Sequence, residues 1–380
     1  MFICPVCKNT EEKYIGYRNG RPYCRRCIQF SGETVNSNDT FFCDGEVDVF
    51  LKYPLTKEQE RCSNKILENF KNNKNTLVYA VCGAGKTELV FALIKYAIER
   101  KMNIGFAIPR RDVVLEISKR LEASFPDEKI NIVCGGFTNN LTGNITCLTT
   151  HQLYRYNRYF DLLIMDEIDA FPYKDNPLLI EMFKRSIKGN YVLMSATPSE
   201  SVLNEFKKED NEIVYLYKRF HGKPLPLPKI VISPSYLKYH QLIKIMKKMI
   251  DRKEQVFVFA PTINKCEEVF NFIRFFIKRG DFVHSKREKR AEIIQNFKNK
   301  NLDYLVTTAV LERGVTVKNL QVIIFESDHK IFNTSSLIQI SGRVGRAIDA
   351  PFGEVYFLAD KKTIYMEEAV DEIKRINGQL

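Results

Sequence analysis

The stretch Ala80-Val81-Cys82-Gly83-Ala84-Gly85-Lys86-Thr87 decides the fold. It stands where an apolar run expected to be a strand, Thr76–Cys82, gives way to a pattern of helical spacing, Glu88–Arg100. Glycines in such a loop let backbone amides approach phosphates, and the helix N-terminus adds its positive dipole. The stretch therefore predicts a nucleotide-binding phosphate loop. A glycine-rich turn formed by chance is the alternative, because Ala80 occupies a position that is more often glycine.

Within this loop each residue has an expected contact. Gly83, Ala84 and Gly85 bring the backbone to the phosphates, and Lys86 reaches the β- and γ-phosphates. The hydroxyl of Thr87 is expected to bind Mg²⁺. These residues predict ATP and Mg²⁺ as cofactors.

A pair of carboxylates supports the same chemistry. The apolar strand Asp161–Met165 leads directly into Asp166-Glu167-Ile168-Asp169. A strand-terminal Asp166 beside a phosphate loop can hold Mg²⁺, and Glu167 can orient and deprotonate the attacking water. A solvated acidic turn is the alternative, but the apolar strand in front of it argues against one. Lys86, Asp166 and Glu167 are thus candidate catalytic residues.

Apolar runs alternate with helical patterns along most of the chain. The expected strands are Thr76–Cys82, Asn103–Ile108, Asp161–Met165, Tyr191–Met194, Gln255–Ala260, Asp303–Thr307, Gln321–Glu326 and Gly353–Leu358. Near-continuously apolar strands that alternate with helices predict parallel sheets covered on both faces. The proline-rich segment His221–Pro228 separates two such sets. We therefore expect an α/β fold with two parallel-sheet lobes, residues 46–220 and 221–380, preceded by a small element in residues 1–45.

That small element carries four cysteines in two pairs. Cys4-Pro5-Val6-Cys7 and Cys24-Arg25-Arg26-Cys27 have the spacing of a structural zinc site. Four thiolates from Cys4, Cys7, Cys24 and Cys27 would fill the coordination sphere, so a catalytic metal is not expected. A redox dithiol or a chance arrangement is the alternative. The remaining cysteines are expected to be buried apolar residues: Cys43, Cys62, Cys82, Cys134, Cys147 and Cys266.

Between the cysteine pairs the sequence predicts a hairpin that turns at Asn19-Gly20, as in a zinc ribbon. Basic and aromatic side chains crowd it: Arg18, Arg21, Arg25, Arg26, Tyr14, Tyr17 and Tyr23. They could contact nucleic acid or form the solvated surface of the ribbon, and the sequence does not decide between the two.

The composition excludes several classes of protein. The chain has 380 residues and a formal net charge of +12, with 44% hydrophobic residues. This excludes collagen-like, disordered and disulfide-dense small proteins. The positive charge admits a polyanionic partner such as nucleic acid without requiring one. No run reaches the roughly 18 apolar residues of a membrane span, and the first residues lack a signal peptide's features. A cytoplasmic location is expected, with docking onto a membrane protein left open.

Further motifs follow in order. They are Gln59 within Leu55-Thr56-x2-Gln59, then Ser195-Ala196-Thr197, then Thr307-Thr308-Ala309-x2-Glu312-Arg313-Gly314, and last Gln339-Ile340-Ser341-Gly342-Arg343-Val344-Gly345-Arg346. Together with the phosphate loop and the carboxylates, this ordered set resembles superfamily 2 helicases and translocases over Leu55 to about Asp360. The resemblance implies two RecA-like lobes that sandwich ATP, and a nucleic-acid-dependent ATPase.

The resemblance also implies roles for residues outside the phosphate loop. Gln59 would read adenine, and Glu312 and Gly314 would border the nucleotide. Gln339 would contact the phosphate or water. Arg343 and Arg346 would deliver guanidinium groups that stabilise the γ-phosphate transition state. Taken alone, Arg343 could instead be a surface salt-bridge partner.

Residues that contact the nucleic-acid strand are then expected on loops at the ends of the sheets. They are Arg110, Arg111, Gly135, Gly136, Thr150 and His151 in the first lobe, and Thr262, His284, Thr307 and Thr308 in the second. Small residues allow close approach, while hydroxyl and amide groups suit phosphate oxygens. Ordinary turn chemistry remains open for each of them.

The zinc element ahead of two compact lobes, with Asp166-Glu167-Ile168-Asp169-Ala170-Phe171-Pro172, narrows the resemblance to the late competence protein family ComFA of Gram-positive bacteria. That family implies a motor on single-stranded DNA that drives uptake of transforming DNA, with ATP, Mg²⁺ and Zn²⁺. It also implies a ComEC-like membrane channel and a ComFC-like protein as partners.

Three other functions are compatible with parts of the sequence. A PriA-like replication-restart or repair helicase is the main alternative, although PriA is longer and carries its zinc cysteines inside the helicase portion. An RNA remodeller is possible, because backbone contacts distinguish ribose poorly. A non-catalytic zinc DNA-binding protein would need a broken nucleotide site, whereas Lys86, Asp166, Glu167 and Arg346 are all present.

Overall fold

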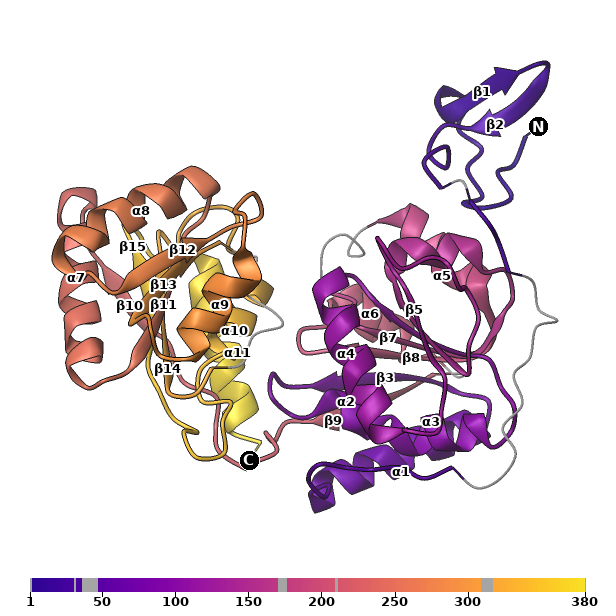
Figure 1. The fold of residues 1–380 in the computed structure, drawn as a ribbon, viewed down its shortest axis with the longest axis horizontal. Helices are drawn as coiled ribbons and strands as arrows, with labels where there is room; N and C mark the ends of the chain where they lie inside the picture. Colours follow the sequence, from indigo (N-terminus) through magenta and orange to yellow (C-terminus); the bar gives the residue numbers. More distant parts are fainter. Residues whose placement is uncertain are drawn as a thin grey trace. The chain divides into compact units, whose positions relative to one another are not determined.

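The computed structural model describes residues 2–30, 32–35, 47–169, 176–208, 211–308 and 317–379. The chain forms two compact units, Met1–Ala80 with Gly85–Leu216, and Val81–Ala84 with Tyr217–Leu380 (Figure 1). The division after Leu216 falls just ahead of the proline-rich segment in which the sequence placed a boundary. The N-terminal element clusters with the first unit, and the three-part division at residues 45 and 220 stays a prediction.

The first unit is built on a seven-stranded sheet of order β5-β6-β4-β7-β8-β3-β9. Its neighbouring strands all pair in parallel. The strands are β3 (Asn75–Ala80), β4 (Ile104–Ile108), β5 (Ile130–Val133), β6 (Ile145–Thr149), β7 (Phe160–Asp166), β8 (Ile187–Ser195) and β9 (Asn211–Leu216). The parallel sheet and the four strands expected in this part of the sequence are confirmed, with ends that shift by a few residues.

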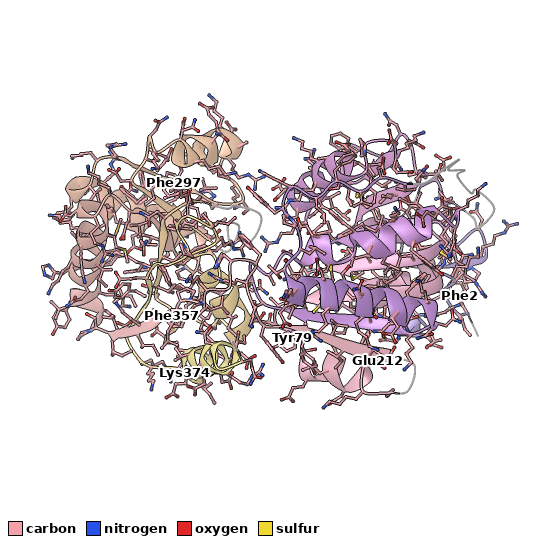
Figure 2. The ribbon with its side chains drawn as sticks, turned by 90° about the horizontal axis from the view of Figure 1, so that it is seen from below. Phe2, Tyr79, Glu212, Phe297, Phe357 and Lys374 are labelled. Atoms are coloured by element: carbon pink, nitrogen blue, oxygen red, sulfur yellow. The ribbon has the colours of Figure 1, made fainter. Side chains whose placement is uncertain are left out.

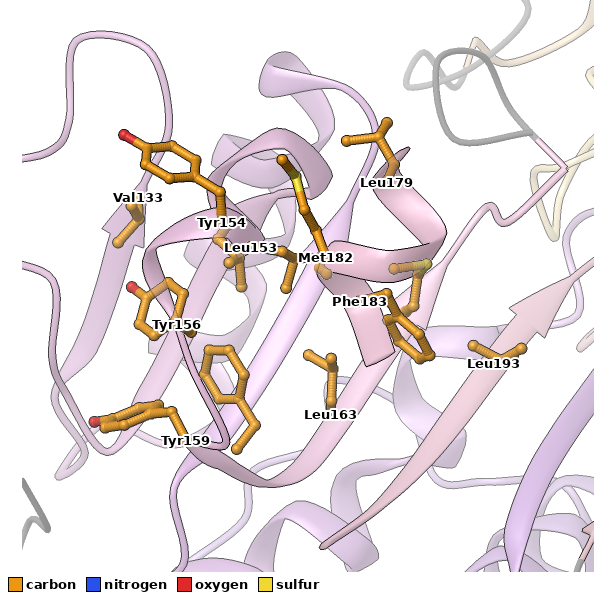
Figure 3. Close-up of a cluster of buried hydrophobic side chains, with 14 of the residues drawn as sticks. Val133, Leu153, Tyr154, Tyr156, Tyr159, Leu163, Leu179, Met182, Phe183 and Leu193 are labelled. Carbon is orange, nitrogen blue, oxygen red and sulfur yellow. The ribbon is translucent and has the colours of Figure 1, made fainter. Parts of the chain in front are cut away.

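Helices cover both faces of this sheet. They are α1 (Lys57–Lys71), α2 (Lys86–Leu89), α3 (Phe91–Ile98), α4 (Arg111–Ser124), the 3-10 helix η2 (Thr150–Arg155), α5 (Pro177–Ser186) and α6 (Glu200–Glu205). Helix α1 packs on β3 and β9, and α4 packs on β4, β5 and β6. A core between the sheet and η2 with α5 buries Tyr156, Tyr159, Leu163 and Met182 (Figure 3). Burial on both sides explains why these strands are apolar throughout.

The expected single helix Glu88–Arg100 is two helices, so this prediction was wrong in detail. The break is at Val90, whose φ of −95° and ψ of 0° depart from helical values. Val90 is β-branched and fully buried. Its side chain is held by the core, and β-branching lowers helix propensity, so packing overrides the helical pattern here.

The second unit contains a six-stranded sheet of order β10-β15-β14-β11-β13-β12, again with all neighbours parallel. Its strands are β10 (Lys229–Ile232), β11 (Gln255–Phe259), β12 (Gly280–Val283), β13 (Tyr304–Thr307), β14 (Leu320–Phe325) and β15 (Val355–Ala359). Its helices are α7 (Ser235–Asp251), α8 (Ile263–Phe276), α9 (Arg290–Lys298), α10 (Thr334–Ser341) and α11 (Ile364–Asn377).

Helices α7 and α8 lie on one face of this sheet, and α9, α10 and α11 lie on the other (Figure 1). Phe297 from α9 and Phe357 from β15 are fully buried (Figure 2). Phe297 stacks on Phe257 with ring centroids 4.9 Å apart. Each lobe is therefore a three-layer α/β unit, which confirms the expected fold class. None of the described helices combines the length and the apolar character that crossing a bilayer requires.

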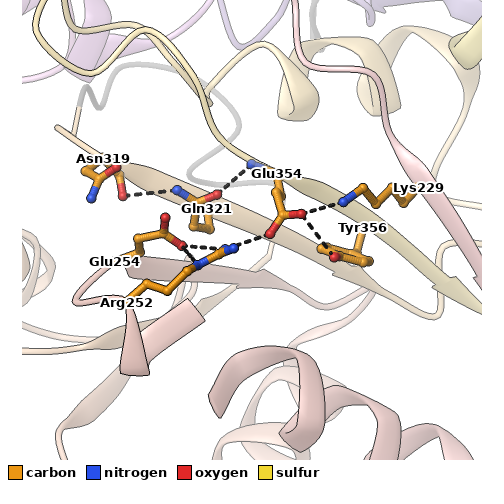
Figure 4. Close-up of polar contacts among 7 residues, drawn as sticks. All are labelled: Lys229, Arg252, Glu254, Asn319, Gln321, Glu354 and Tyr356. Atoms are coloured by element: carbon orange, nitrogen blue, oxygen red, sulfur yellow. Dashed lines mark hydrogen bonds and ion pairs between the residues drawn. The ribbon is translucent and has the colours of Figure 1, made fainter. Parts of the chain in front are cut away.

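A network of polar side chains connects neighbouring strands of the second sheet (Figure 4). The carboxylate of Glu354 accepts from Arg252 at 2.6 Å and also pairs with Lys229. Its backbone N–H donates to the side-chain oxygen of Gln321 at 2.5 Å. Burial acts to raise the pKa of Glu354, but Lys229 and Arg252 outweigh it and lower this pKa to about 2. The network links β10, α7, β14 and the start of β15 through charge-assisted hydrogen bonds.

Candidate nucleotide site and metal centre

The strand order brings the candidate catalytic loops of the first unit to one edge of its sheet. β3 and β7 both flank β8, with Tyr79 level with Ser195 and Asp166 level with Met194. Because the strands are parallel, the loops that follow β3, β7 and β8 all leave from the same edge. Ligands of open α/β sheets bind outside this carboxyl edge. The register alone therefore gathers the phosphate loop, the carboxylates and the Ser195–Thr197 segment.

The phosphate loop has the backbone that its glycines predict. Gly83 and Gly85 have φ values of 81° and 75°, which L side chains rarely adopt. Helix α2 begins directly at Lys86, whose ammonium donates to the carbonyl of Ala80 at 3.4 Å. Thr87 is buried in the first turn. The loop thus passes straight into a helix N-terminus, where backbone amides are available to an anion.

Gln59 lies beside this loop and also caps the N-terminus of α1. Its side-chain oxygen accepts the N–H of Thr56 at 2.9 Å, while the Thr56 hydroxyl accepts the N–H of Gln59 at 3.3 Å. This capping box starts α1. A Cβ atom on Gly85 would lie 2.6 Å from the amide nitrogen of Gln59. The glutamine is therefore positioned next to the loop, and its reading of adenine stays a prediction.

The two candidate carboxylates follow β7 in an unusual conformation. Asp166 is buried and accepts the backbone N–H of Glu167 at 2.8 Å. Glu167 has a φ of 59°. A non-glycine residue in the left-handed region costs on the order of 1–3 kcal/mol and is enriched at functional sites. The chain therefore turns sharply at Glu167, where the sequence predicts a catalytic residue.

Asp169 makes a connection that the sequence analysis missed. Its two carboxylate oxygens accept the hydroxyl of Ser195 at 2.7 Å and the hydroxyl of Thr197 at 2.9 Å. The bonds tie the carboxylate loop after β7 to the segment after β8. The available signal was an acidic residue three positions after Asp166, followed by a Ser-x-Thr at the end of the next strand.

In the second unit, the arginine-bearing segment follows α10. Gln339 is buried in this helix and donates to the Ser335 hydroxyl at 3.3 Å. Arg343 is only 2% exposed, and Arg346 donates through its Nε to the carbonyl of Gly342 at 2.8 Å. Gly345 has a φ of 67°, and a Cβ atom there would lie 2.3 Å from the Pro351 carbonyl oxygen. Only glycine fits this turn.

Arg219 and His221 hold the same segment, and the sequence analysis did not single them out. The buried guanidinium of Arg219 donates to the carbonyls of Val344 at 2.9 Å, Gly345 at 2.8 Å and Gly342 at 3.3 Å. Burial and the nearby charge of Arg346 lower the pKa of Arg219 to about 10. A buried guanidinium that satisfies three carbonyls fixes the Gly342–Arg346 turn.

His221 adds a further bond to this turn. Its Nε2 lies 2.9 Å from the carbonyl of Gly345, and its Nδ1 accepts the N–H of Lys223 at 3.1 Å. These two bonds require the neutral tautomer protonated on Nε2. Burial lowers the pKa of His221, which favours that neutral form.

The residues expected to contact a nucleic-acid strand differ in their exposure. Those at the surface are Arg111, Gly135, Gly136 and Thr262, with Arg110 and His151 half-buried. Thr150, His284, Thr307 and Thr308 are buried. His284 binds Glu267 at 2.9 Å, and the Thr262 hydroxyl caps α8 by accepting the N–H of Lys265. Strand contact stays a prediction for all ten. Glu312, Gly314 and Pro172 lie outside the described residues.

The four N-terminal cysteines converge. Their sulfur atoms all lie within 4.8 Å of one another, with Cys4 and Cys27 at 3.8 Å and Cys7 and Cys24 at 3.7 Å. A tetrahedron with Zn–S bonds of about 2.3 Å has edges of about 3.8 Å. Without a cation, burial raises the pKa of Cys7 to about 11. The arrangement fits a structural zinc, which would hold the four sulfurs as thiolates.

The single cysteines are unlike this cluster. Cys62, Cys82, Cys134, Cys147 and Cys266 are all buried, as expected, and Cys43 lies outside the described residues. Burial raises the pKa of Cys147 and of Cys266 to about 12. Thiols of this kind are core residues rather than ligands or nucleophiles.

Two known family models match this chain, one in each of the two lobes. Residues 52–200 match the family model of the type III restriction enzyme res subunit, and residues 237–348 match the helicase conserved C-terminal domain. The fold resembles the structure of Saccharomyces cerevisiae Dbp5 bound to RNA and ADP BeF3, with a TM-score of 0.63 and 16% identity over 86% of this chain and 92% of that one. This likeness shows the fold alone. The two family models identify a nucleic-acid-dependent ATPase of the superfamily 2 type.

Two curated relatives match almost the whole chain. Competence protein ComFA of Streptococcus pneumoniae (strain ATCC BAA-255 / R6) is 35% identical, and the match covers 99% of this chain and 90% of that protein. Competence protein ComFA of Bacillus subtilis (strain 168) is 32% identical, with 99% and 86% covered. The match includes the cysteine element as well as both lobes, so the chain belongs to the ComFA family of competence proteins.

Proposed function

We propose that this protein is an ATP-driven motor on single-stranded DNA, which draws transforming DNA into the cytoplasm during competence. The observation that carries the proposal is the sheet register, which brings the phosphate loop, Asp166 and Ser195 to one edge of the first lobe. Membership of the ComFA family supplies the biological context. A second RecA-like lobe, with buried Arg343 in a rigid turn, provides the other half that a helicase-type motor needs.

For ATP hydrolysis we assign the following roles. Lys86 and the amides of the phosphate loop bind the β- and γ-phosphates, and Glu167 orients and deprotonates the attacking water. Thr87 and Asp166 would hold Mg²⁺, which when bound supplies positive charge next to the phosphates. Arg343 and Arg346 stabilise the charge that develops on the γ-phosphate. The buried Arg219 keeps their turn in shape through the carbonyls of Gly342, Val344 and Gly345.

Movement along DNA needs a link between the nucleotide site and the strand-binding loops. The bonds of Asp169 to Ser195 and Thr197 are the candidate for that link, because Asp169 lies close in sequence to Glu167. Exposed and half-buried groups at the ends of β4 and β5, Arg110, Arg111, Gly135 and Gly136, are the proposed backbone contacts in the first lobe.

Membership of the family is the support for the partners and the location that we propose. A ComEC-like membrane channel would deliver the strand, and a ComFC-like protein would act with the motor on the cytoplasmic side. The zinc in the cysteine element would be structural, since all four of its positions are filled by sulfur.

Displacement of streptavidin from a biotinylated single strand tests this proposal. The wild-type protein is expected to remove streptavidin from one end of an oligodeoxynucleotide in an ATP-dependent manner. Glu167→Gln should bind ATP and DNA yet leave streptavidin in place. Lys95→Ala, which alters a half-buried lysine of α3 that pairs with Glu99, is the control and should behave as wild type. Failure of the wild-type protein at both ends would contradict the motor assignment.

A further inference from the structure

The hairpin of the zinc element carries two arginines whose positions destabilise the hairpin. Strands β1 (Ile15–Arg18) and β2 (Arg21–Cys24) pair antiparallel around the turn Asn19-Gly20. In this register Arg18 lies directly opposite Arg21. Like charges in directly opposed positions destabilise a β ladder. Folding does not need this pair, whereas an anion bound between the two guanidiniums would remove the repulsion.

Two other cations of the same element share one carboxylate. Glu11 pairs with Lys13 at 2.7 Å and with Arg26 at 3.0 Å, and the Arg26 guanidinium lies 3.8 Å from the centroid of the Tyr14 ring. Within the part of the chain that the structure describes, no carboxylate pairs with Arg18 or Arg21. The hairpin tip therefore presents two exposed positive charges, whereas Lys13 and Arg26 share the carboxylate of Glu11.

An aromatic ring lies on the same face as this pair. Because side chains alternate along a strand, Gly16 and Tyr23 share a face with Arg18 and Arg21. A Cβ atom on Gly16 would lie 2.5 Å from the Tyr23 ring, so the ring rests across a strand that has no side chain there. The result is a ring held flat and half-buried, followed along the hairpin by two guanidiniums. Tyr17, which is 73% exposed, stands on the opposite face.

The zinc element is anchored beside a loop proposed to contact DNA. The Phe30 ring stacks near His151, with centroids 6.3 Å apart, and lies 5.5 Å from the Tyr154 ring. The Arg155 guanidinium donates to the carbonyl of Glu33 at 2.9 Å. These contacts fall on η2, which begins at Thr150 directly after β6. The hairpin is thus an extension of the first lobe on the side that carries His151.

We infer that the face formed by Arg18, Arg21 and Tyr23 is a second binding site for single-stranded DNA, in which a base stacks on Tyr23 and the adjacent phosphates lie between the two arginines. A flat ring next to opposed guanidiniums suits an alternation of bases and phosphates, as in other single-strand binding surfaces. An acidic protein would use the charges but leave the ring unexplained. The inference rests on the proposed function, which supplies single-stranded DNA as the substrate.

Titration of the zinc-loaded, full-length protein with a fluorescent oligothymidylate tests the arginines. Each phosphate contact to a single strand contributes about 0.7 to the slope of log K against log salt concentration. Arg18→Ser/Arg21→Ser is expected to reduce that slope by about 1.4, and Arg18→Lys/Arg21→Lys should restore it. Lys247→Ser/Lys248→Ser removes the same charge from exposed positions on α7 and should leave the slope unchanged.

Abasic oligonucleotides test the ring. Base–aromatic stacking is worth about 1–3 kcal/mol, so removing the bases should weaken binding to the wild type at least about fivefold more than binding to Tyr23→Ala. Zinc content and proteolytic resistance establish that each variant keeps the element folded. A Tyr23→Leu variant serves as a less disruptive second test of the ring if Tyr23→Ala loses zinc.

The outcomes separate the two proposals. If single-stranded DNA stimulates ATP hydrolysis by the wild type and by Arg18→Ser/Arg21→Ser at the same DNA concentration, with equal salt slopes, the hairpin site is overturned and the motor is not. If single-stranded DNA fails to stimulate the wild type at all, the proposed function itself fails. Arginine dependence without any effect of the bases would overturn the stacking assignment and point to a purely ionic contact.

Discussion

The hydroxyl of Ser195 donates to a carboxylate oxygen of Asp169 at 2.7 Å, which joins the ends of two neighbouring strands. Thr197 occupies the other carboxylate oxygen at 2.9 Å. Asp169 is half-buried, and because its carboxylate accepts two hydroxyls it is held in one orientation. The loop that carries Glu167 therefore cannot move independently of the segment after β8.

We predict that Ser195→Ala destabilises the first lobe and uncouples it from DNA. A hydrogen bond to a charged group contributes about 1.5–3 kcal/mol, so thermal unfolding of the variant should show a loss of that size. Hydrolysis without DNA should persist, while its stimulation by DNA declines. Thr197→Ser keeps a hydroxyl and is the control. Full stimulation by DNA in Ser195→Ala would contradict the coupling role.

Arg219 should act on turnover through the turn that it holds. Arg219→Ala leaves the carbonyls of Gly342, Val344 and Gly345 without their donor. We expect kcat for ATP hydrolysis to fall by about tenfold or more, which corresponds to a loss of about 1.4 kcal/mol, while the KM for ATP changes little. Arg219→Lys should restore part of the rate. Steady-state kinetics would contradict this account if KM rose and kcat did not change.

Acid should weaken the second lobe through Glu354. Its folded-state pKa of about 2 lies below the ordinary value of 4.5, because Lys229 and Arg252 outweigh the effect of burial. The stabilising contribution is complete above about pH 4.5 and is lost as the pH falls from there towards 2. Unfolding by denaturant at several pH values should show this loss in the wild type and a flatter profile in Glu354→Gln. Identical profiles would show that the network of Figure 4 does not stabilise the fold.

Removing one ligand should release the metal from the cysteine element. Cys24→Ser replaces a buried cysteine whose sulfur lies 3.7 Å from the sulfur of Cys7. The small core of this element consists mainly of the cysteines themselves, so its order depends on the metal. We expect the variant to lose stoichiometric zinc, measured by atomic emission, and to be cut by protease within residues 2–30. Cys62→Ala, which removes a buried thiol elsewhere, should keep its zinc. Stoichiometric zinc in Cys24→Ser would rule out the four-sulfur site.

Much of the fold could be predicted because its signals are local. Strands buried on both faces, such as β7 and β11, read as continuous apolar runs, and Asn19-Gly20 forms the expected hairpin turn with φ values of 50° and 74°. The break at Val90 could not be predicted, because it depends on how that side chain packs in the finished core. Helical spacing alone carries no information about such packing.

Some features of the candidate site could likewise be predicted from the sequence, and others could not. The phosphate loop and the acidic residues at the end of β7 are motifs of consecutive residues, so the sequence displays them. The partners of Asp169 and of Arg219 are distant in sequence and appear only when the chain is folded. The burial of Thr150 and His284 could not be predicted either. A hydroxyl or imidazole side chain next to a strand end has the same sequence pattern whether it faces solvent or packs against a neighbouring element.

ATP hydrolysis measured with single-stranded DNA, duplex DNA and RNA tests the central claim most directly. The account predicts that single-stranded DNA stimulates the wild-type enzyme most strongly. Lys86→Ala should lose ATP binding, and Glu167→Gln should bind ATP but turn over at least about 100-fold more slowly. Stimulation by RNA alone, or no stimulation by any nucleic acid, would contradict a motor on single-stranded DNA.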